Sequence, residues 1–139
     1  MAIDIRKLEE GREIFTKISQ SKEIRDRFKF LIERQHSENR EHGIGICSKN
    51  NSLIITSPCI EVSCKTSPKC PENSKLVADF HTHPKRSKPT EEDIGRSIDR
   101  KLSISCIGAI DNNRKTTTCY YPYFHKRRIF TEYIGSLID

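Results

Sequence analysis

Two histidines spaced two residues apart are the first side chains in this sequence that could do chemistry together. His81 and His83 lie at the end of residues 76–83, a stretch whose composition predicts a β-strand. Side chains at i and i+2 leave the same face of a strand, so their Cβ atoms are expected about 6.6 Å apart. Two imidazoles at that separation can converge on one metal ion.

Asp93 can supply a third group to the same ion. Pro84 ends the predicted strand, because proline has no N–H for the ladder, and Pro89 and Thr90 then predict the start of a helix. Two neutral imidazoles and a carboxylate form a ligand set suited to Zn²⁺, with a fourth position left for water. The alternative is that Thr90 and Asp93 only form a capping box and the histidines only end a strand. Both roles are compatible, since a capped helix is a rigid mount for a ligand.

The elements that must hold these groups alternate between helices and strands. Helices are expected at residues 3–19, where Gly11 interrupts the apolar pattern, at 22–35 and at 91–101. Strands are expected at residues 41–47, 53–56, 60–63, 76–83, 102–110 and 116–121, with residues 121–124 leaving the sheet. Residues 128–133 read equally as a last strand or a short helix. This order predicts a layered α/β domain.

Length and charge narrow the class of protein. The chain has 139 residues, which fits one domain, and a formal net charge of +6. No apolar run approaches the roughly 20 residues of a membrane span, and the charged first residues lack the apolar region of a signal peptide. We therefore expect a cytoplasmic protein with no membrane partner. The basic residues 85–88 and 126–128 are the densest cationic clusters, and most such runs are simply solvated faces.

The cysteines form no Cys-x-x-Cys pair, so a structural zinc knuckle is not predicted. The chain contains six of them: Cys47, Cys59, Cys64, Cys70, Cys106 and Cys119. In a reducing cytoplasm they are expected as free thiols. A disulfide among Cys59, Cys64 and Cys70 is the alternative if the source is a hyperthermophile.

The sequence His81-Thr82-His83-Pro84, followed by residues 89–93, resembles the JAMM metalloprotease motif of the MPN (JAB1/MPN/Mov34) family. The resemblance covers about residues 22–122 and is closest in type to small prokaryotic or archaeal members. It implies an α/β, MPN-type (cytidine-deaminase-like) fold, in which helices flank a mixed β-sheet. It also implies a domain at residues 22–139 behind an N-terminal helical extension at residues 1–21, and Zn²⁺ bound by His81, His83 and Asp93.

The same resemblance implies two catalytic residues. Glu41, at the start of the strand predicted at residues 41–47, corresponds to the family's general base, with Glu38 as the alternative. Thr90 takes the place of the motif's serine, which steadies the oxyanion. The loop between His83 and Asp93 is one residue shorter than in many members, which could shift Asp93 or Thr90. His42 alternates to the other face of its strand and is expected to be structural.

The function implied is that of a zinc-dependent metallo-isopeptidase or peptidase acting after the C-terminal tail of a ubiquitin-like (modifier or sulfur-carrier) protein. The partner is then that protein or its conjugates, its tail held as an added strand by residues 59–75, and the cations of residues 85–88 suit an acidic surface. The alternatives are a non-catalytic MPN interaction module and a RadC-like nucleic-acid-associated protein. Nucleic acid is not expected, because the sequence shows no helix-hairpin-helix segment or aromatic stacking pattern. The sequence does not determine the oligomeric state.

Overall fold

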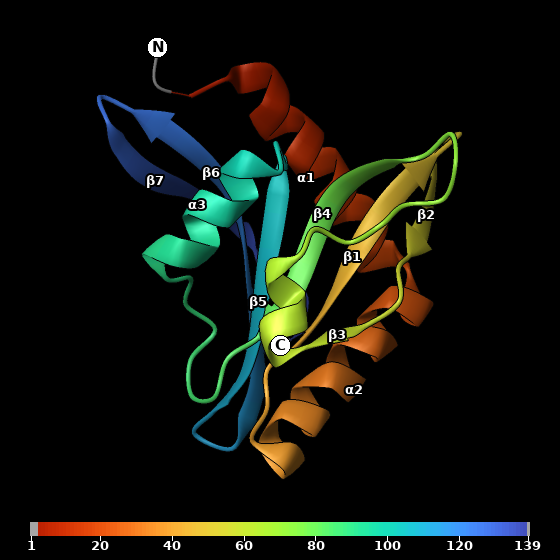
Figure 1. The fold of residues 1–139 in the computed structure, drawn as a ribbon, viewed down its shortest axis with the longest axis vertical. Helices are drawn as coiled ribbons and strands as arrows, with labels where there is room; N and C mark the ends of the chain where they lie inside the picture. Colours follow the sequence, from red (N-terminus) through yellow and green to blue (C-terminus); the bar gives the residue numbers. More distant parts are fainter. Residues whose placement is uncertain (1–2, 139) are drawn as a thin grey trace.

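The computed structural model describes residues 3–138 and has a mixed α/β fold, which confirms the predicted fold class (Figure 1). Residues 1, 2 and 139, at the outer ends of the predicted divisions 1–21 and 22–139, lie outside the described residues. The elements are α1 (Ile5–Gln20), α2 (Lys22–Glu38), β1 (His42–Lys49), β2 (Ser52–Ile55), β3 (Cys59–Ile60), the 3-10 helix η1 (Glu61–Lys65), β4 (Lys75–Thr82), α3 (Glu91–Asp99), β5 (Ile104–Asp111), β6 (Arg114–His125) and β7 (Arg128–Gly135).

One sheet contains all the strands, in the order β2-β1-β4-β5-β6-β7, with β3 also paired to β1. All described pairings are antiparallel except that of β4 with β5. Parallel neighbours need a crossover, and α3 provides it. The first turn of α3 therefore lies beside the carboxyl end of β4, a usual place for functional groups in α/β sheets.

The helices cover both faces of the sheet. Figure 1 shows α3 and η1 on one side, while α1 and α2 lie behind. On the α1–α2 side, the rings of Phe28 and Phe80 stack with centroids 3.9 Å apart. Ile14 and Ile18 of α1 belong to the same apolar core. Burial of these side chains is the main force that fixes β4 against α2.

The α3 side of the sheet is more polar. Arg100, at the end of α3, donates to Asp79 on β4 at 3.2 Å. Its other terminal nitrogen donates to the carbonyls of Cys64 and Lys65 at 3.1 and 3.2 Å. One buried guanidinium thus ties α3, β4 and η1 together.

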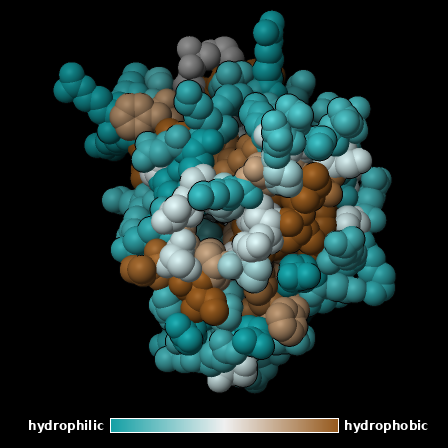
Figure 2. Space-filling model, turned by 45° about the vertical axis from the view of Figure 1, so that its right-hand side comes forward, coloured by the Kyte–Doolittle hydropathy of each residue, from teal (hydrophilic) through white to brown (hydrophobic). Residues whose placement is uncertain are grey.

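The surface is mostly hydrophilic on the face drawn in Figure 2, with smaller apolar patches between polar side chains. Val62, on η1, is 73% exposed. Within residues 3–138, no helix is long and apolar enough to cross a membrane.

Several local predictions needed correction. The helix predicted at residues 22–35 continues to Glu38 and ends at Asn39, which takes the left-handed conformation (φ 52°). Gly11 does not interrupt α1; it lies against the chain at Ser103, whose oxygen would be 2.3 Å from an added Cβ. The strand predicted at residues 60–63 is wrong, because the chain turns into η1 directly after Ile60.

The end of the sheet also differs from the prediction. Residues 121–124 do not leave the sheet, since β6 continues to His125 and pairs with β7 along this stretch. Of the two alternatives for residues 128–133, the strand is confirmed. Pro122 has no N–H for the ladder, but its neighbours on both sides pair with β7 and keep the strand in the sheet, a tertiary effect absent from local sequence.

The prediction of free thiols is wrong. Disulfides join Cys47 to Cys70, Cys59 to Cys64 and Cys106 to Cys119, and no described cysteine is free. The alternative of a disulfide among Cys59, Cys64 and Cys70 is confirmed by the second pair. The third pair follows from strand register, which places the two cysteines opposite each other. The cytoplasmic location stays a prediction.

Candidate metal centre

His81, His83 and Asp93 converge as predicted from their spacing. Nε2 of His81 lies 2.9 Å from Oδ1 of Asp93, and Nε2 of His83 lies 3.0 Å from Oδ2. Candidate ligand atoms of the three side chains all lie within 4.8 Å of one another. The ligands of a tetrahedral zinc ion at roughly 2.0 Å are about 3.3 Å apart. The three side chains therefore form a possible metal site that needs little movement to close on an ion.

The polar atoms at this centre fit a cation. Nε2 of His81 is buried, and although it lies close to Asp93 the contact lacks hydrogen-bond geometry, so it has no hydrogen-bond partner among the described residues. A buried ring nitrogen with no hydrogen-bond partner is costly unless something binds it. A metal ion held jointly with His83 and Asp93 satisfies that nitrogen.

His81 and Asp93 each shift the pKa of the other toward its charged form. Burial alone lowers the pKa of His81, but contact with Asp93 and its negative charge outweigh burial and raise that pKa. Burial alone raises the pKa of Asp93, whereas its contacts with the two histidines hold that pKa well below its usual range. Asp93 is thus a carboxylate at neutral pH, the form that binds a cation.

Thr82, between the two histidines, fixes the strand that carries them. Its side chain points to the opposite face, where Oγ1 donates to Oε1 of Gln35 on α2 at 2.8 Å. The same oxygen accepts the backbone N–H of His42 at 2.9 Å. Beyond the strand, the N–H of His83 donates to the Gly108 carbonyl at 2.8 Å and so continues the ladder. Both histidines therefore project from restrained backbone.

Asp93 is held by a capping box at the start of α3. The Asp93 N–H donates to Oγ1 of Thr90 at 3.2 Å, and the Thr90 N–H donates to Oδ2 of Asp93 at 2.8 Å. The capping role and the metal-binding geometry coexist in this structure. The shortened loop before α3 does not displace Asp93. Ser87 in that loop contacts Thr118 on β6 at 3.0 Å, which anchors it.

The strand register distinguishes the two candidate glutamates. Gly43 pairs with His81, so Glu41, two residues earlier, lies opposite His83 on the same face. Glu41 is half-buried and lines the cavity beside His83. Glu38 instead contacts Nε2 of the buried His42 at 3.0 Å, on the other face of β1. The geometry therefore favours Glu41, and His42 is structural as expected.

Thr90, His83 and Asp93 share a cavity of about 360 Å³ with Glu41. Sequence reasoning missed two further groups on its wall. Glu61 begins η1 with a positive φ of 54°, and Arg96 lies one turn along α3 from Asp93. No local motif marks either residue; only the crossover helix and the 3-10 turn bring them to the cavity.

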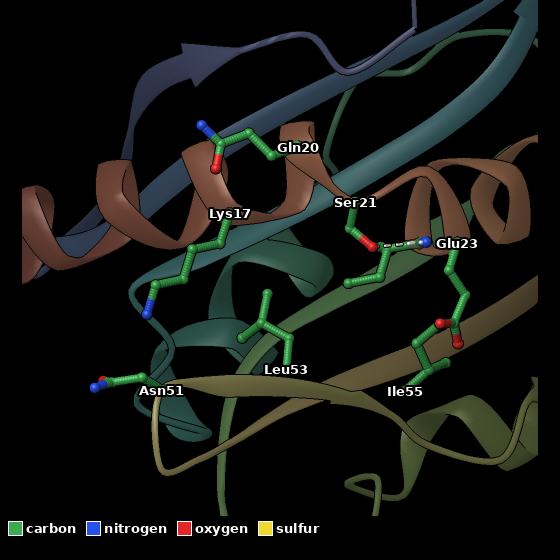
Figure 3. A pocket seen from close by; sticks show the side chains of 8 residues that line it. Lys17, Gln20, Ser21, Glu23, Asn51, Leu53 and Ile55 are labelled. Atoms are coloured by element: carbon green, nitrogen blue, oxygen red, sulfur yellow. Dashed lines mark hydrogen bonds between the residues drawn. The ribbon is translucent and has the colours of Figure 1, made fainter.

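A different cavity, of about 280 Å³, lies where the α1–α2 junction faces β2 (Figure 3). Its wall includes Lys17, Glu23 and Leu53. Figure 3 shows Lys17 and Glu23 extending from separate helices rather than meeting. It contains no cluster of metal-binding side chains, and among residues 3–138 only His81, His83 and Asp93 form such a cluster.

Comparison with known proteins finds likeness only among solved structures. Neither a protein-family model nor a curated protein sequence matches the chain. A structural match is found to a JAB1/MPN domain protein from Archaeoglobus fulgidus, at 20% identity and a TM-score of 0.44. The match covers 68% of this chain and 82% of that one.

Proposed function

We propose that this protein is a zinc-dependent metallo-isopeptidase or peptidase that cleaves after the C-terminal tail of a ubiquitin-like (modifier or sulfur-carrier) protein. The observation that carries the proposal is the convergence of His81, His83 and Asp93 beside a cavity that also contains Glu41 and Thr90. Non-catalytic modules of the family usually lack one or more of the ligands, and here the set is complete.

His81, His83 and Asp93 would hold the ion through two ring nitrogens and a carboxylate oxygen. When bound, zinc lowers the pKa of water towards roughly 7 and polarises a carbonyl. Because each ligand is mounted on paired or capped backbone, the protein supplies the site with little conformational cost.

Glu41 would move the proton. Its half-buried carboxylate faces the cavity opposite His83, and it can accept a proton from the attacking water and pass it to the leaving amine nitrogen. Its backbone is fixed, because the Glu41 carbonyl accepts the Glu61 N–H at 2.9 Å. On fixed backbone, the carboxylate can accept a proton and the resulting carboxylic acid can donate it without moving far.

Thr90 would steady the oxyanion. Its Oγ1 accepts the Asp93 N–H through a lone pair, so the hydroxyl proton stays free to donate to a developing negative charge. Capping and oxyanion binding therefore use different parts of one hydroxyl group.

The substrate tail would lie along β3 and η1. The Ser63 hydroxyl accepts the Ile60 N–H at 2.8 Å and donates to the Ile60 carbonyl at 2.7 Å, so an extended peptide added at the outer edge of β3 would displace this hydroxyl. The exposed cations Lys85, Arg86 and Lys88, in the loop between the ligands, suit an acidic partner surface.

The decisive experiment is cleavage of ubiquitin-like and sulfur-carrier proteins fused at their C-terminal tail to a reporter. Zinc-loaded protein is expected to release the reporter, and a chelator to stop it. Glu41→Gln should keep zinc and lose hydrolysis, because glutamine cannot accept the proton. Glu38→Gln is the matched control and should retain activity. Hydrolysis by Glu41→Gln at the wild-type rate would contradict the assignment of the base.

A further inference from the structure

The β6–β7 hairpin projects from the sheet at the end opposite the metal centre (Figure 1). Its last pairing with β5 is at Tyr120, after which β6 runs on to His125 with β7 alone beside it. Lys126 and Arg127 form the tip, both in the left-handed conformation (φ 49° and 64°) that a tight two-residue turn requires. The tip is therefore an ordered, protruding element.

Aromatic side chains follow one face of this hairpin. Tyr121 and Tyr123 alternate along β6, and the register places Phe130 of β7 opposite Tyr123. The Tyr121 and Tyr123 ring centroids are 5.7 Å apart, and those of Tyr123 and Phe130 are 5.5 Å apart, with planes within 18° of parallel. His125 continues the series, tilted, 6.4 Å from Phe130. The sequence does not reveal this stack, because its members meet only across the two strands.

Positive charge lies at the tip end of the aromatic stack. Lys126, Arg127 and Arg128 are all exposed, and none is ion-paired to a described carboxylate. The acids near the rings are Asp4, which also lines the cavity at the hairpin base, and Glu132 on β7. Asp4 caps α1 by accepting the N–H groups of its first turn, and Glu132 stands opposite Tyr121, away from the tip.

A cavity of about 500 Å³ lies at the base of the hairpin, between the start of α1 and the end of α3. Tyr121, Tyr123 and Phe124 line it from β6. Lys7 and Lys101 line it from the helices, and Phe124 is 57% exposed. Aromatic rings and cations therefore continue from the tip into a hollow at the base.

We propose that the β6–β7 hairpin and the cavity at its base bind single-stranded nucleic acid. Sequence-tolerant binders of single strands combine cations that track the phosphates with aromatic rings on which bases stack. Both features occur on this hairpin: Arg128 is paired with His125 and shares the face of the rings, and Lys126 and Arg127 form the tip. Bases in a duplex are already stacked on each other, so an aromatic series of this kind favours a single strand.

Two other partners fit less well. A hairpin that enters a membrane leads with apolar or aromatic side chains, whereas here the leading residues are Lys126 and Arg127. An acidic protein surface would account for the cations but not for the stacked rings of Tyr123 and Phe130.

The test is fluorescence anisotropy of labelled oligo(dT) and oligo(U) with the full chain, with a labelled DNA duplex and anionic vesicles as competing probes. If the three tip cations contact phosphates, the plot of log affinity against log salt should have a slope of about −2 for single strands. Arg127→Gln with Arg128→Gln should reduce this slope to about −0.7. The exposed helical pair Arg12→Gln with Arg27→Gln is the matched control, and it should leave the slope near −2.

The stacking contribution is tested separately. Phe130→Ala should weaken oligo(dT) binding about tenfold. Phe30→Ala, which removes an exposed ring from α2, should not weaken it; Phe30 is 49% exposed and Phe130 is 38% exposed. Circular dichroism of each variant checks that the fold is retained.

Four results would overturn the proposal: no oligonucleotide binding at low salt, equal affinity for the duplex, binding to anionic vesicles alone, or equal losses in the tip and control variants. The outcome is independent of hydrolysis at the metal centre, because the hairpin lies at the other end of the sheet.

Discussion

Arg100 offers a sharp test of how the wall of the metal-centre cavity is held. The structure predicts that Arg100→Met loosens η1 and destabilises the whole domain. The guanidinium and the Asp79 carboxylate are only 10% and 8% exposed, and their nitrogen–oxygen distance is 3.2 Å. The same side chain satisfies the carbonyls of Cys64 and Lys65. Removing it leaves a buried carboxylate without a counter-charge.

The size of the effect follows from burial. Breaking a buried ion pair by removing one partner costs about 3–5 kcal/mol. Oδ1 of Asp79 already has no hydrogen-bond partner among the described residues, so the carboxylate has no second donor to fall back on. Replacing both members, as in Arg100→Met with Asp79→Leu, should recover much of the loss, because no unpaired charge remains.

Urea unfolding measures these free energies. Lys115→Met is the control: its pair with Glu33 is shorter, at 2.8 Å, but the two side chains are 34% and 56% exposed. We expect that variant to lose at most about 1 kcal/mol. If Arg100→Met also lost less than about 1 kcal/mol, the buried contacts of Arg100 would not be what holds η1 in place, and the reasoning would be refuted.

Three further predictions concern the disulfides, the helix cap and pH. Replacing Cys47 and Cys70 by serine should lower the free energy of unfolding by about 3 kcal/mol, and replacing Cys59 and Cys64 by about 2 kcal/mol. The longer loop, with a sequence separation of 23 rather than 5, restricts the unfolded chain more. The reverse order in urea unfolding would count against this entropic account. Thr90→Ser should keep the stability of α3, whereas Thr90→Val should lose about 1 kcal/mol because it removes the cap. Thermal unfolding measures the difference, and equal stability of the two variants would refute a capping role. In metal-free protein, the lowered pKa of Asp93 adds stability that is present above its ordinary pKa of 3.8 and is lost as pH falls through the folded-state pKa. The raised pKa of His81 adds stability that is present below its ordinary pKa of 6.5 and is lost as pH rises through the folded-state pKa. Zinc needs neutral imidazoles, so the rise in melting temperature on adding zinc should grow from pH 5 to pH 8; a rise that shrinks with pH would contradict binding by the histidines.

The parts of the fold that local patterns determine were predictable from sequence. The strand carrying His81 and the helix start at Thr90 each depend on neighbours within a few residues. The i and i+2 rule placed the two histidines together, and a helix start after a short loop was enough to bring Asp93 to them. The three candidate metal ligands could therefore be predicted from the spacing of the motif.

What the sequence did not reveal depends on contacts between distant segments. The continuation of β6 past Tyr121 requires β7 as a partner, and the disulfides require strand register and the fold of the loop at residues 66–74. Glu61 reaches the cavity only because η1 replaces the expected strand. Likewise, the physical reason to prefer Glu41 to Glu38 is the pairing of Gly43 with His81, which the sequence alone does not give.

Zinc stoichiometry tests the central claim most directly. Elemental analysis of zinc-loaded, dialysed protein should give about one zinc ion per chain. His83→Ala and Asp93→Asn should each lose the ion, because each removes one of three convergent ligands. His36→Ala, which removes an exposed histidine from α2, is the matched control and should keep it. Wild-type protein without zinc, or His83→Ala with undiminished zinc, would contradict the proposed centre.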